Sequence, residues 1–316
     1  MSYHVVIPKD ITEPGKAYLR AHGCRITVGN GSRDLDYIRE LIRDADGILA
    51  RTGDYSQQVL SAATHLKVVG RHGVGMDGFA LDYCRERGIR VVNAPGANTQ
   101  SVAEHTIGQM IALAHRFSAY DRSVREGDWG ILRRLDSWDL YGKTLGIVGV
   151  GAIGKAVANM ARTAFSMELI GFSPRPPKGG VPQGMELVDD LETLFSRADF
   201  VSLHLPLKPE TRGIVDEHLL SKMKKDAYLI NNARGGVVDE QALVRALQEG
   251  WIAGAAVDVF TTEPLERSHP FTGLNNLLLT PHSAALTRES LDRMGLMAAK
   301  GIVDVLEGRE PEFPVV

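Results

Sequence analysis

The feature of this sequence that most constrains its fold is a glycine pattern at residues 149–154. Gly149, Gly151 and Gly154 form G-x-G-x-x-G in "TLGIVGVGAIGKAVANMA", directly after an apolar run and directly before a helix-like stretch. Glycines permit a tight turn, close approach of the backbone to a pyrophosphate, and close packing of helix on strand. The pattern therefore predicts a strand, a turn and a helix whose N-terminal amides bind a dinucleotide. The alternative is a tight α/β corner that binds nothing.

Short apolar runs alternate with helix-like segments on both sides of this turn. The runs before it are "YHVVI", "RITV", "DGILA", "LKVVG" and "IRVVN", and the runs from the turn onward are "TLGIVG", "MELIGF", "DFVSLHL", "AYLINN", "IAGAAVD" and "NLLLT". Strands that alternate with helical crossovers form parallel sheets covered on both faces. The sequence thus predicts an α/β protein with two doubly wound parallel-sheet lobes.

The length of 316 residues also fits two lobes, because domains usually hold roughly 100–200 residues. We expect one domain at residues 98–286. The other is expected to be discontinuous, with residues 1–97 and 287–316, because a closing helix at residues 288–306 can pack back on the first lobe. Ser101 and Glu104 read S-x-x-E, a capping box that predicts the start of a long helix at Ser101.

The composition excludes several classes of protein. A net charge of -3 gives no sign of a surface for nucleic acid. The start "MSYHVVIPKD" has no leader-like pattern, and no apolar run of about 18 residues follows, so neither secretion nor membrane insertion is expected. The two cysteines, Cys24 and Cys84, are too few for a disulfide framework and too isolated for a metal site. We therefore expect a cytoplasmic protein without a metal.

The stretch "IGFSPRPP" raises the question of which dinucleotide is bound. Its Ser173 lies 19 residues beyond Gly154, where an NAD site usually offers an acid to the ribose 2′-hydroxyl. A carboxylate would repel a 2′-phosphate, whereas a hydroxyl and a guanidinium would bind one. Ser173 and Arg175 therefore favour NADP, with NAD possible. The alternative for Arg175 is a solvated side chain in a proline-rich loop.

Three later stretches each place ionisable residues at the C-terminal end of a strand or just beyond it. They are "INNARGGVVDE" with Arg234, "AAVDVFTTEP" with Asp258 and Glu263, and "LLLTPHSAA" with His282. Ligands of open parallel sheets bind outside these strand ends, so the side chains are expected to face one crevice. An arginine can bind a carboxylate bidentately, a histidine can transfer a proton, and a glutamate can orient the imidazole.

Several motifs in one order extend this pattern over most of the chain. They are "GRHGVGMDG", "NAPGANTQSVAEHT", "GIVGVGAIGKAVA", "LHLPLKPETRGIV", "NNARGGVVDE", "VDVFTTEP" and "TPHSAA", which run from Arg71 to Ala285. On these motifs the sequence resembles the D-isomer-specific 2-hydroxyacid dehydrogenase family, in its glyoxylate/hydroxypyruvate reductase or phosphoglycerate dehydrogenase-like branch. The resemblance implies a Rossmann cofactor domain, a flavodoxin-like substrate domain, and NAD(P)-dependent hydride transfer between a small 2-oxo acid and its D-2-hydroxy acid.

The resemblance also implies roles for individual residues. Arg234 would bind the substrate carboxylate and carbonyl, with His282 as acid/base and Glu263 as its partner. The substrate would also meet the amides of Val74 and Gly75, and Arg51 is a possible phosphate holder together with Arg71. The expected cofactor contacts are Gly149, Gly151, Ala152, Ile153, Gly154, Ser173, Arg175, His204, Pro206, Thr211, Ala233, Asp258, His282 and Ala284.

Some of these assignments have plain structural alternatives. Asp258, expected at the nicotinamide carboxamide, can instead cap a turn. His204 can be a core histidine and Thr211 a turn residue. His72 and His105 are expected to be structural, because the sequence gives neither of them a partner.

The resemblance has departures as well as matches. The family commonly has an acid where Ser173 stands, often has Asn where Gly78 stands, and often has a glycine pair where this chain reads "SAALT". Family analogy implies a homodimer formed through the cofactor lobe, with its long helix contributing. The alternative function is a catalytically idle, nucleotide-sensing scaffold that binds other proteins.

Overall fold

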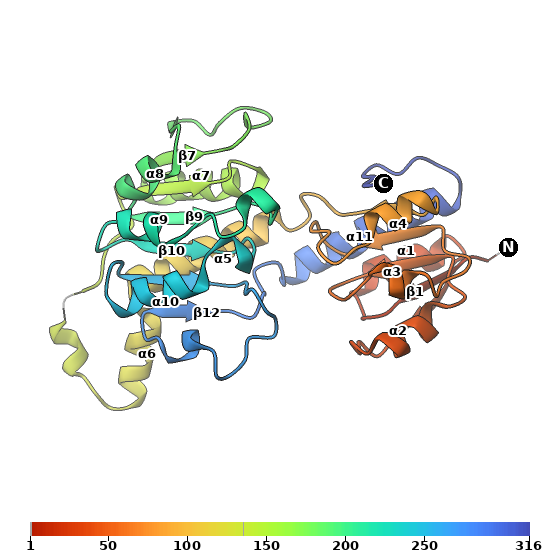
Figure 1. Ribbon diagram of the computed structural model, residues 1–316, viewed down its shortest axis with the longest axis horizontal. Helices are drawn as coiled ribbons and strands as arrows, with labels where there is room; N and C mark the ends of the chain where they lie inside the picture. The colour runs from red at the N-terminus through yellow and green to blue at the C-terminus, as the bar shows by residue number, and fades with distance from the viewer. Residues whose placement is uncertain (1, 135) are drawn as a thin grey trace. The chain divides into compact units, whose positions relative to one another are not determined.

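The computed structural model describes residues 2–134 and 136–316, and the chain divides into two compact units. Unit 1 contains the residues up to Asn98 together with Ala285–Val316, and unit 2 contains Thr99–Ala284. Each unit has a parallel sheet with helices packed on it (Figure 1). The predicted fold class, α/β with two doubly wound parallel-sheet lobes, is confirmed.

Unit 1 has the strand order β2-β1-β3-β4-β5, which is the flavodoxin-like order. Its strands are β1 (His4–Ile7), β2 (Arg25–Val28), β3 (Gly47–Ala50), β4 (Val68–Arg71) and β5 (Arg90–Val92). Its helices are α1 (Glu13–Ala21), α2 (Leu35–Ile42), α3 (Gln57–Leu60), α4 (Leu81–Glu86) and α11 (Arg288–Leu306). Every residue of β1 and β3 is buried, as expected for central parallel strands covered on both faces.

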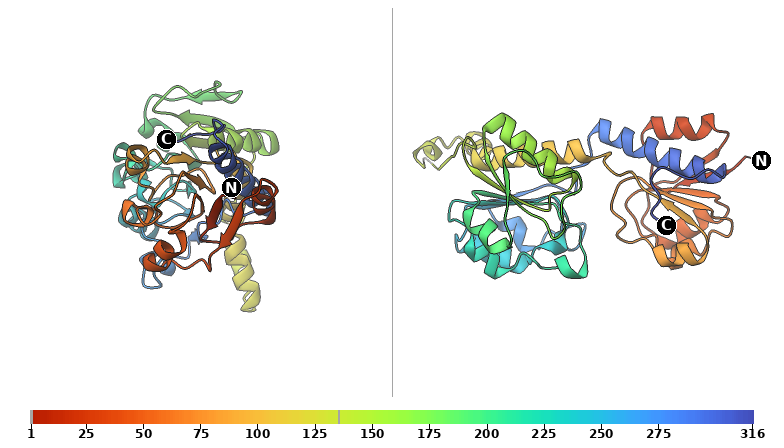
Figure 2. Two further views of the ribbon diagram at one scale, coloured as in Figure 1. Left: turned by 90° about the vertical axis from the view of Figure 1, so that its right-hand side faces the viewer. Right: turned by 90° about the horizontal axis from the view of Figure 1, so that it is seen from above.

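Helix α11 returns to unit 1 because glycines permit a close approach. A Cβ added to Gly70 of β4 would lie 2.7 Å from the Ile302 side chain, and one added to Gly15 of α1 would lie 2.7 Å from the Gly295 carbonyl oxygen. Figure 2 shows α11, in blue, running beside α1. The C-terminal segment therefore completes the core that the N-terminal strands begin.

Unit 2 has the strand order β12-β11-β10-β9-β6-β7-β8, in which the direction of winding changes between β6 and β9. Its strands are β6 (Thr144–Val148), β7 (Glu168–Phe172), β8 (Met185–Leu187), β9 (Phe200–Leu203), β10 (Tyr228–Asn231), β11 (Gly254–Val257) and β12 (Leu277–Leu279). Its α-helices are α5 (Thr99–Ala114), α6 (Phe117–Arg125), α7 (Ala152–Phe165), α8 (Leu191–Arg197), α9 (Glu217–Lys222) and α10 (Glu240–Gln248). Short 3-10 turns are η1 (Gly130–Arg133), η2 (Pro209–Thr211), η3 (Gly235–Val237) and η4 (Pro270–Gly273). Parallel α/β sheets bind ligands at such a reversal point, which here lies beside the glycine turn.

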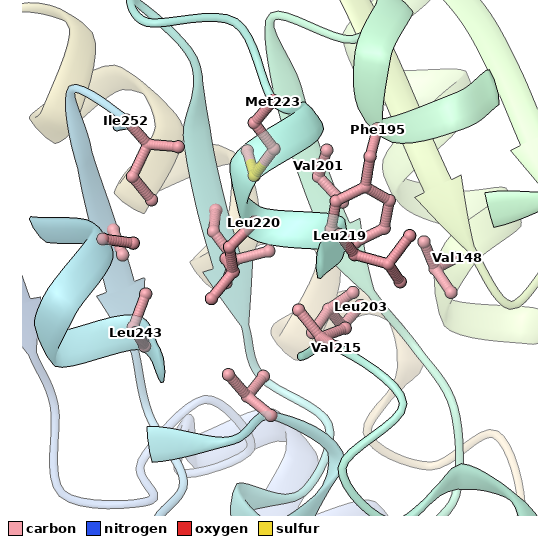
Figure 3. Close-up of a cluster of buried hydrophobic side chains, with 14 of the residues drawn as sticks. Val148, Phe195, Val201, Leu203, Val215, Leu219, Leu220, Met223, Leu243 and Ile252 are labelled. Carbon is pink, nitrogen blue, oxygen red and sulfur yellow. The ribbon is translucent and has the colours of Figure 1, made fainter. Parts of the chain in front are cut away.

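Two apolar layers enclose the sheet of unit 2. Figure 3 shows one layer, a buried cluster that contains Phe195, Leu219 and Leu243 from α8, α9 and α10 together with Val148 and Leu203 of the strands. The opposite layer is formed by α5 and α7. Because helices cover both faces of the sheet, ligand-binding residues are expected in the loops at the carboxyl ends of the strands.

The predicted start of the helix at Ser101 is wrong. Helix α5 begins at Thr99, so Ser101 lies inside the helix and is buried. The Glu104 carboxylate accepts a hydrogen bond of 2.7 Å from the Gln100 side chain, one helical turn earlier. Among the described helices, none has both the length and the apolar character needed to cross a membrane.

Candidate active site

The three glycines of the turn before α7 have different surroundings. Gly149 has a φ of +102°, and a Cβ there would lie 2.8 Å from the His204 carbonyl oxygen. A Cβ at Gly154 would lie 2.4 Å from the Gly149 carbonyl oxygen, so the helix packs directly on the turn. A Cβ at Gly151 would meet no protein atom within 4 Å. Gly151 also has no side chain with which to cap α7, so the first amides of the helix fit the phosphates of a dinucleotide.

The loop after β7 carries cations and no acid at the position that usually contacts the ribose. The Ser173 hydroxyl donates a hydrogen bond of 2.7 Å to the Arg175 carbonyl, which holds the loop in a tight turn. From the first turn of α7, the Lys155 ammonium donates to the Lys178 carbonyl at 2.5 Å. Arg175 and Lys178 are exposed. The loop therefore brings positive charge close to the start of α7.

Arg234 follows β10 in a turn that its neighbours hold firmly. The Asn231 side chain donates to the Arg234 carbonyl at 3.0 Å and accepts from the Ala233 amide at 3.1 Å. A Cβ at Gly235 would lie 2.0 Å from the Phe260 carbonyl carbon, so only glycine allows this turn to pack on the loop after β11. The sequence "NARGG" thus fixes the backbone from which the guanidinium projects.

His282 and Glu263 are joined by hydrogen-bond contacts between their side chains. The Nδ1 atom of His282 lies 2.8 Å from Oε2 of Glu263 and 3.1 Å from Oε1. Burial raises the pKa of Glu263, but the hydrogen bonds from His282 and the Phe260 amide and the charges of His282 and Arg234 outweigh it, and the net pKa is lowered. An ionised carboxylate only accepts hydrogen bonds, so Nδ1 carries a proton. Nε2 of His282 is then the ring nitrogen that can exchange a proton with a ligand.

The backbone of His282 is in the left-handed region, with a φ of +53°. Such a conformation costs a non-glycine residue about 1–3 kcal/mol and persists where the surroundings hold it. Asp258 stabilises this backbone conformation, since its carbonyl accepts a hydrogen bond from the His282 amide at 2.7 Å. Its carboxylate accepts from the amides of Ser283 at 2.8 Å and Ala284 at 2.9 Å. The turn that presents His282 is therefore built around Asp258.

In unit 1, the loop after β4 turns its carbonyl groups toward the protein. The Ala94 amide donates to the Gly73 carbonyl at 2.9 Å, and the Asn93 side chain donates to the Val74 carbonyl at 3.0 Å. Because N–H and C=O point in opposite directions across a trans peptide bond, the amides of Val74 and Gly75 point away from these contacts. A backbone N–H that points away from such contacts can bind an anionic ligand.

Residues 107–284, more than half of the chain, match the family described as "D-isomer specific 2-hydroxyacid dehydrogenase, NAD binding domain". The chain belongs to the D-isomer-specific 2-hydroxyacid dehydrogenase family. The predicted family is thereby confirmed. So is the predicted enzyme class, since members of this family are NAD(P)-dependent dehydrogenases.

Relatives of this 2-hydroxyacid dehydrogenase include two kinds of enzyme. A glyoxylate reductase of Thermofilum pendens is 41% identical over 97% of this chain and 92% of its own. A D-3-phosphoglycerate dehydrogenase of Methanocaldococcus jannaschii is 44% identical over 86% of this chain but only 52% of its own. The chain thus spans about half the length of that relative. A solved structure of an NADPH-dependent glyoxylate/hydroxypyruvate reductase from Sinorhizobium meliloti, in complex with NADP and malonate, is 27% identical with a TM-score of 0.86 over 100% of this chain and 97% of that one.

Other residues that were predicted from the sequence to contact the cofactor have hydrogen bonds within the protein. The Thr211 hydroxyl donates to the Pro206 carbonyl at 2.6 Å and accepts from the Lys208 amide at 2.8 Å, which are the bonds of a turn. His204 lies 3.0 Å from the Ser202 hydroxyl, and burial lowers its pKa to about 4, so the ring is neutral at pH 7. Both carboxylate oxygens of Asp258 are engaged in the turn described above, and its side chain is 1% exposed. Their cofactor contacts remain predictions.

Sequence reasoning missed a set of polar residues on α5. His105 was expected to be structural, without a partner evident from the sequence; in the structure its Nε2 atom lies 3.2 Å from the Thr280 hydroxyl. Gln109, one turn further along α5, donates to the same hydroxyl at 3.3 Å. The signal in the sequence is "EHTIGQ", which places His105, Thr106 and Gln109 at positions i, i+1 and i+4 of the helix, on neighbouring parts of its surface.

Proposed function

We propose that this enzyme interconverts a small 2-oxo acid and its D-2-hydroxy acid by NAD(P)-dependent hydride transfer, with Arg234, Glu263 and His282 as its catalytic residues. The observation that carries the proposal is the 2.8 Å contact between Nδ1 of His282 and Glu263, in a turn that Asp258 holds. The lowered pKa of Glu263 supports it further, because the carboxylate stays ionised beside the imidazole. Family membership supplies the reaction class.

Each of the three residues has one task in the proposed reduction. The nicotinamide, when bound, supplies the hydride that adds to the carbonyl carbon. His282 donates a proton from Nε2 to the carbonyl oxygen, so one 2-oxo acid, one hydride and one proton give one 2-hydroxy acid. Arg234 binds the substrate carboxylate bidentately and polarises the carbonyl. Glu263 keeps Nδ1 of the imidazole occupied, which directs Nε2 to the substrate.

We further propose the division of labour between the units that the sequence suggested. Unit 2, expected at residues 98–286, binds the dinucleotide, and unit 1, expected at residues 1–97 and 287–316, contributes to substrate binding. The outward amides of Val74 and Gly75 support a carboxylate contact there. Arg51, whose guanidinium donates to the Asp10 carbonyl at 2.7 Å, keeps further N–H donors for a polar substrate.

NADP is the cofactor that we propose, with NAD as the weaker ligand. Ser173 in place of an acid and the cations Lys155, Arg175 and Lys178 support the choice, because a 2′-phosphate needs donors and positive charge. The experiment is kcat/KM with NADPH and with NADH for wild type and Arg175→Ala. We expect the ratio to fall roughly tenfold in the variant, as for the loss of one charge-assisted hydrogen bond. An unchanged ratio would remove Arg175 from cofactor selection.

The substrate that we propose is a small unphosphorylated 2-oxo acid such as glyoxylate or hydroxypyruvate. Support comes from the Thermofilum glyoxylate reductase, which is 41% identical over 97% of this chain, and from the Sinorhizobium glyoxylate/hydroxypyruvate reductase, whose structure matches 100% of it. Assays of purified protein with glyoxylate, hydroxypyruvate, pyruvate and the 2-oxo acid of 3-phosphoglycerate, each with NADPH and NADH, test this choice. A clear preference for the phosphorylated acid would contradict it.

We propose that two copies of unit 2 associate in a homodimer. Large apolar side chains are exposed within residues 117–134 and 136–141, namely Phe117, Val124, Trp129, Leu132, Trp138 and Tyr141. Such a concentration typically marks an interface, and family analogy names a second copy as the occupant. Trp129→Glu with Leu132→Glu is expected to give a monomer in sedimentation, whereas Val28→Glu, an exposed apolar position in unit 1, serves as control. A wild-type monomer would overturn the proposal.

Two remaining expectations have unequal support. A location in a reducing cytoplasm is proposed from the buried free thiols of Cys24 and Cys84. The scaffold alternative is not carried forward, because the relatives described above are named as reductases and dehydrogenases.

A further inference from the structure

Polar side chains of α5 reach the two turns that carry Arg234 and His282. His105 and Gln109 meet the Thr280 hydroxyl at 3.2 and 3.3 Å, and Thr280 donates to Oδ1 of Asp258 at 2.6 Å. Gln109 is 4% exposed and Asp258 is 1% exposed, so these bonds are shielded from water. In a shielded site every donor and acceptor needs a hydrogen-bond partner, because an unpaired polar group lowers the stability of the folded protein.

The Thr280 hydroxyl determines the direction of every bond around it. It has one hydrogen and two lone pairs. Its hydrogen goes to the Asp258 carboxylate, which can only accept, so both lone pairs must accept from His105 and Gln109. His105 therefore carries its proton on Nε2, and the Gln109 amide nitrogen faces Thr280. The hydroxyl is then fully used.

A second branch of the network leads from Gln109 to the Arg234 turn. The Gln109 carbonyl oxygen accepts a hydrogen bond of 2.9 Å from the Asn232 side-chain amide. Asn232 also donates a hydrogen bond to the Thr106 hydroxyl at 2.9 Å. The Thr106 hydroxyl in turn donates to the Val102 carbonyl at 2.8 Å. Asn232 is two residues from Arg234. One glutamine side chain therefore contacts both Thr280, near the acid/base, and Asn232, near the substrate-binding arginine.

We propose that His105, Gln109 and Thr280 are positioning residues, which orient the Asp258 carboxylate and through it the left-handed turn of His282. The proposal rests on the proposed function, since it concerns the same proton transfer. Asp258 holds the amides of Ser283 and Ala284 only while its carboxylate keeps its orientation. Thr280 supplies the short bond to Oδ1 that fixes this orientation. Displacing a catalytic group by about 1 Å can cost roughly a hundredfold in rate.

The kinetic test uses substitutions that keep shape and remove hydrogen bonds. Thr280→Val is expected to lower kcat roughly 10- to 100-fold and leave KM for the 2-oxo acid within about threefold, because the Gln109 side chain still holds Asn232 near Arg234. Gln109→Met is expected to lower kcat and also to raise KM, because it releases Asn232 as well. Thr280→Ser, which restores the hydroxyl, is expected to return kcat to within about threefold of wild type.

A second measurement needs no activity. In the full-length protein, Thr280→Val is expected to speed hydrogen exchange at residues 282–284 severalfold, because the Ser283 and Ala284 amides lose the fixed acceptor. The matched control is Thr193→Val, which removes a hydroxyl-to-carboxylate bond of 2.9 Å to Asp190 at the start of α8. This control is expected to speed exchange only around α8 and to leave kcat unchanged.

The outcomes separate the inference from the proposed function. Unchanged exchange at residues 282–284 in Thr280→Val would overturn the inference whether or not the enzyme reduces 2-oxo acids. Faster exchange with wild-type kcat, or equal kcat losses in Thr280→Val and Thr193→Val, would also overturn it. A wild-type protein that reduces no 2-oxo acid would refute the proposed function, and the exchange experiment would still decide whether the network holds the turn.

Discussion

The glycine turn allows a sharp test of dinucleotide binding, because a methyl group meets different surroundings at Gly151 and Gly154. At Gly151 the added Cβ would project into open space, and the backbone φ of −86° suits alanine. We expect Gly151→Ala to change the free energy of unfolding by only about 0.5 kcal/mol, the usual difference between glycine and alanine at a helix N-cap. The same methyl would stand between a pyrophosphate and the amides of α7. Loss of one charge-assisted hydrogen bond costs about 1.5–3 kcal/mol, so Kd should rise roughly 10- to 100-fold.

Gly154→Ala should behave in the opposite way. Its Cβ would lie 2.4 Å from the Gly149 carbonyl oxygen, about 1 Å closer than ordinary van der Waals contact, so α7 must shift away from the turn. Overpacking of this kind typically costs about 1–3 kcal/mol. Each kcal/mol lowers Tm by roughly 2–4 °C in a protein of this size. We therefore expect a clear loss of thermal stability even without cofactor.

The assay is fluorescence titration of NADPH and NADH together with thermal unfolding of the unliganded proteins. The expected pattern is a weak binder of normal Tm for Gly151→Ala, and a protein of lowered Tm for Gly154→Ala. If Gly151→Ala bound both dinucleotides with wild-type Kd, the pyrophosphate would not lie against the N-terminus of α7. The physical reading of the glycine pattern would then be refuted.

Three further predictions concern charge and pH. Arg234→Lys is expected to raise KM for 2-oxo acids at least tenfold, since one ammonium cannot replace a bidentate guanidinium, and a near-normal KM would contradict the assigned role. Glu263→Gln should lower kcat for reduction, because a neutral amide stabilises a protonated imidazole less than an ionised carboxylate does, and an unchanged kcat in a variant with normal Kd for NADPH would refute the pairing. Burial, with the charges of Arg51 and Arg71, lowers the pKa of His72 from 6.5 to about 4, so the stability due to its neutral ring is complete above pH 6.5 and is lost as the pH falls toward 4. The loss amounts to about 3 kcal/mol, and urea unfolding of wild type should show this slope while His72→Asn should flatten it.

Much of the architecture follows from patterns that are local in the sequence. Buried parallel strands consist of continuous apolar residues, as in β1, β3 and β10, so their runs are recognisable without any tertiary information. The glycine turn is recognisable for a similar reason, because its spacing between an apolar run and a helix is local in the sequence, and Gly154 packs on the Gly149 carbonyl only five residues earlier. The predicted start of α5 failed because Glu104 bonds to the Gln100 side chain, and the S-x-x-E spacing does not distinguish that pairing from a cap.

The residue types of the candidate site could be predicted from the sequence. The hydrogen bonds that hold those residues in place could not. Arg234, Glu263 and His282 stand out as ionisable residues near strand ends. The partnership of His105 with Thr280 joins residues 175 positions apart, and no local pattern contains such a contact. The role of Asp258 in the His282 turn depends on a backbone φ of +53°, which a histidine rarely adopts and which its own sequence neighbours do not require.

The account depends most on His282 as the group that transfers the proton. Asparagine tolerates the left-handed conformation, so His282→Asn should keep the turn while removing the titratable ring. The decisive measurement is steady-state NADPH oxidation by wild type and His282→Asn with the best 2-oxo acid, alongside the Kd for NADPH. We expect kcat to fall roughly 10²- to 10⁴-fold with an unchanged Kd. A variant that retained wild-type kcat would contradict the central claim.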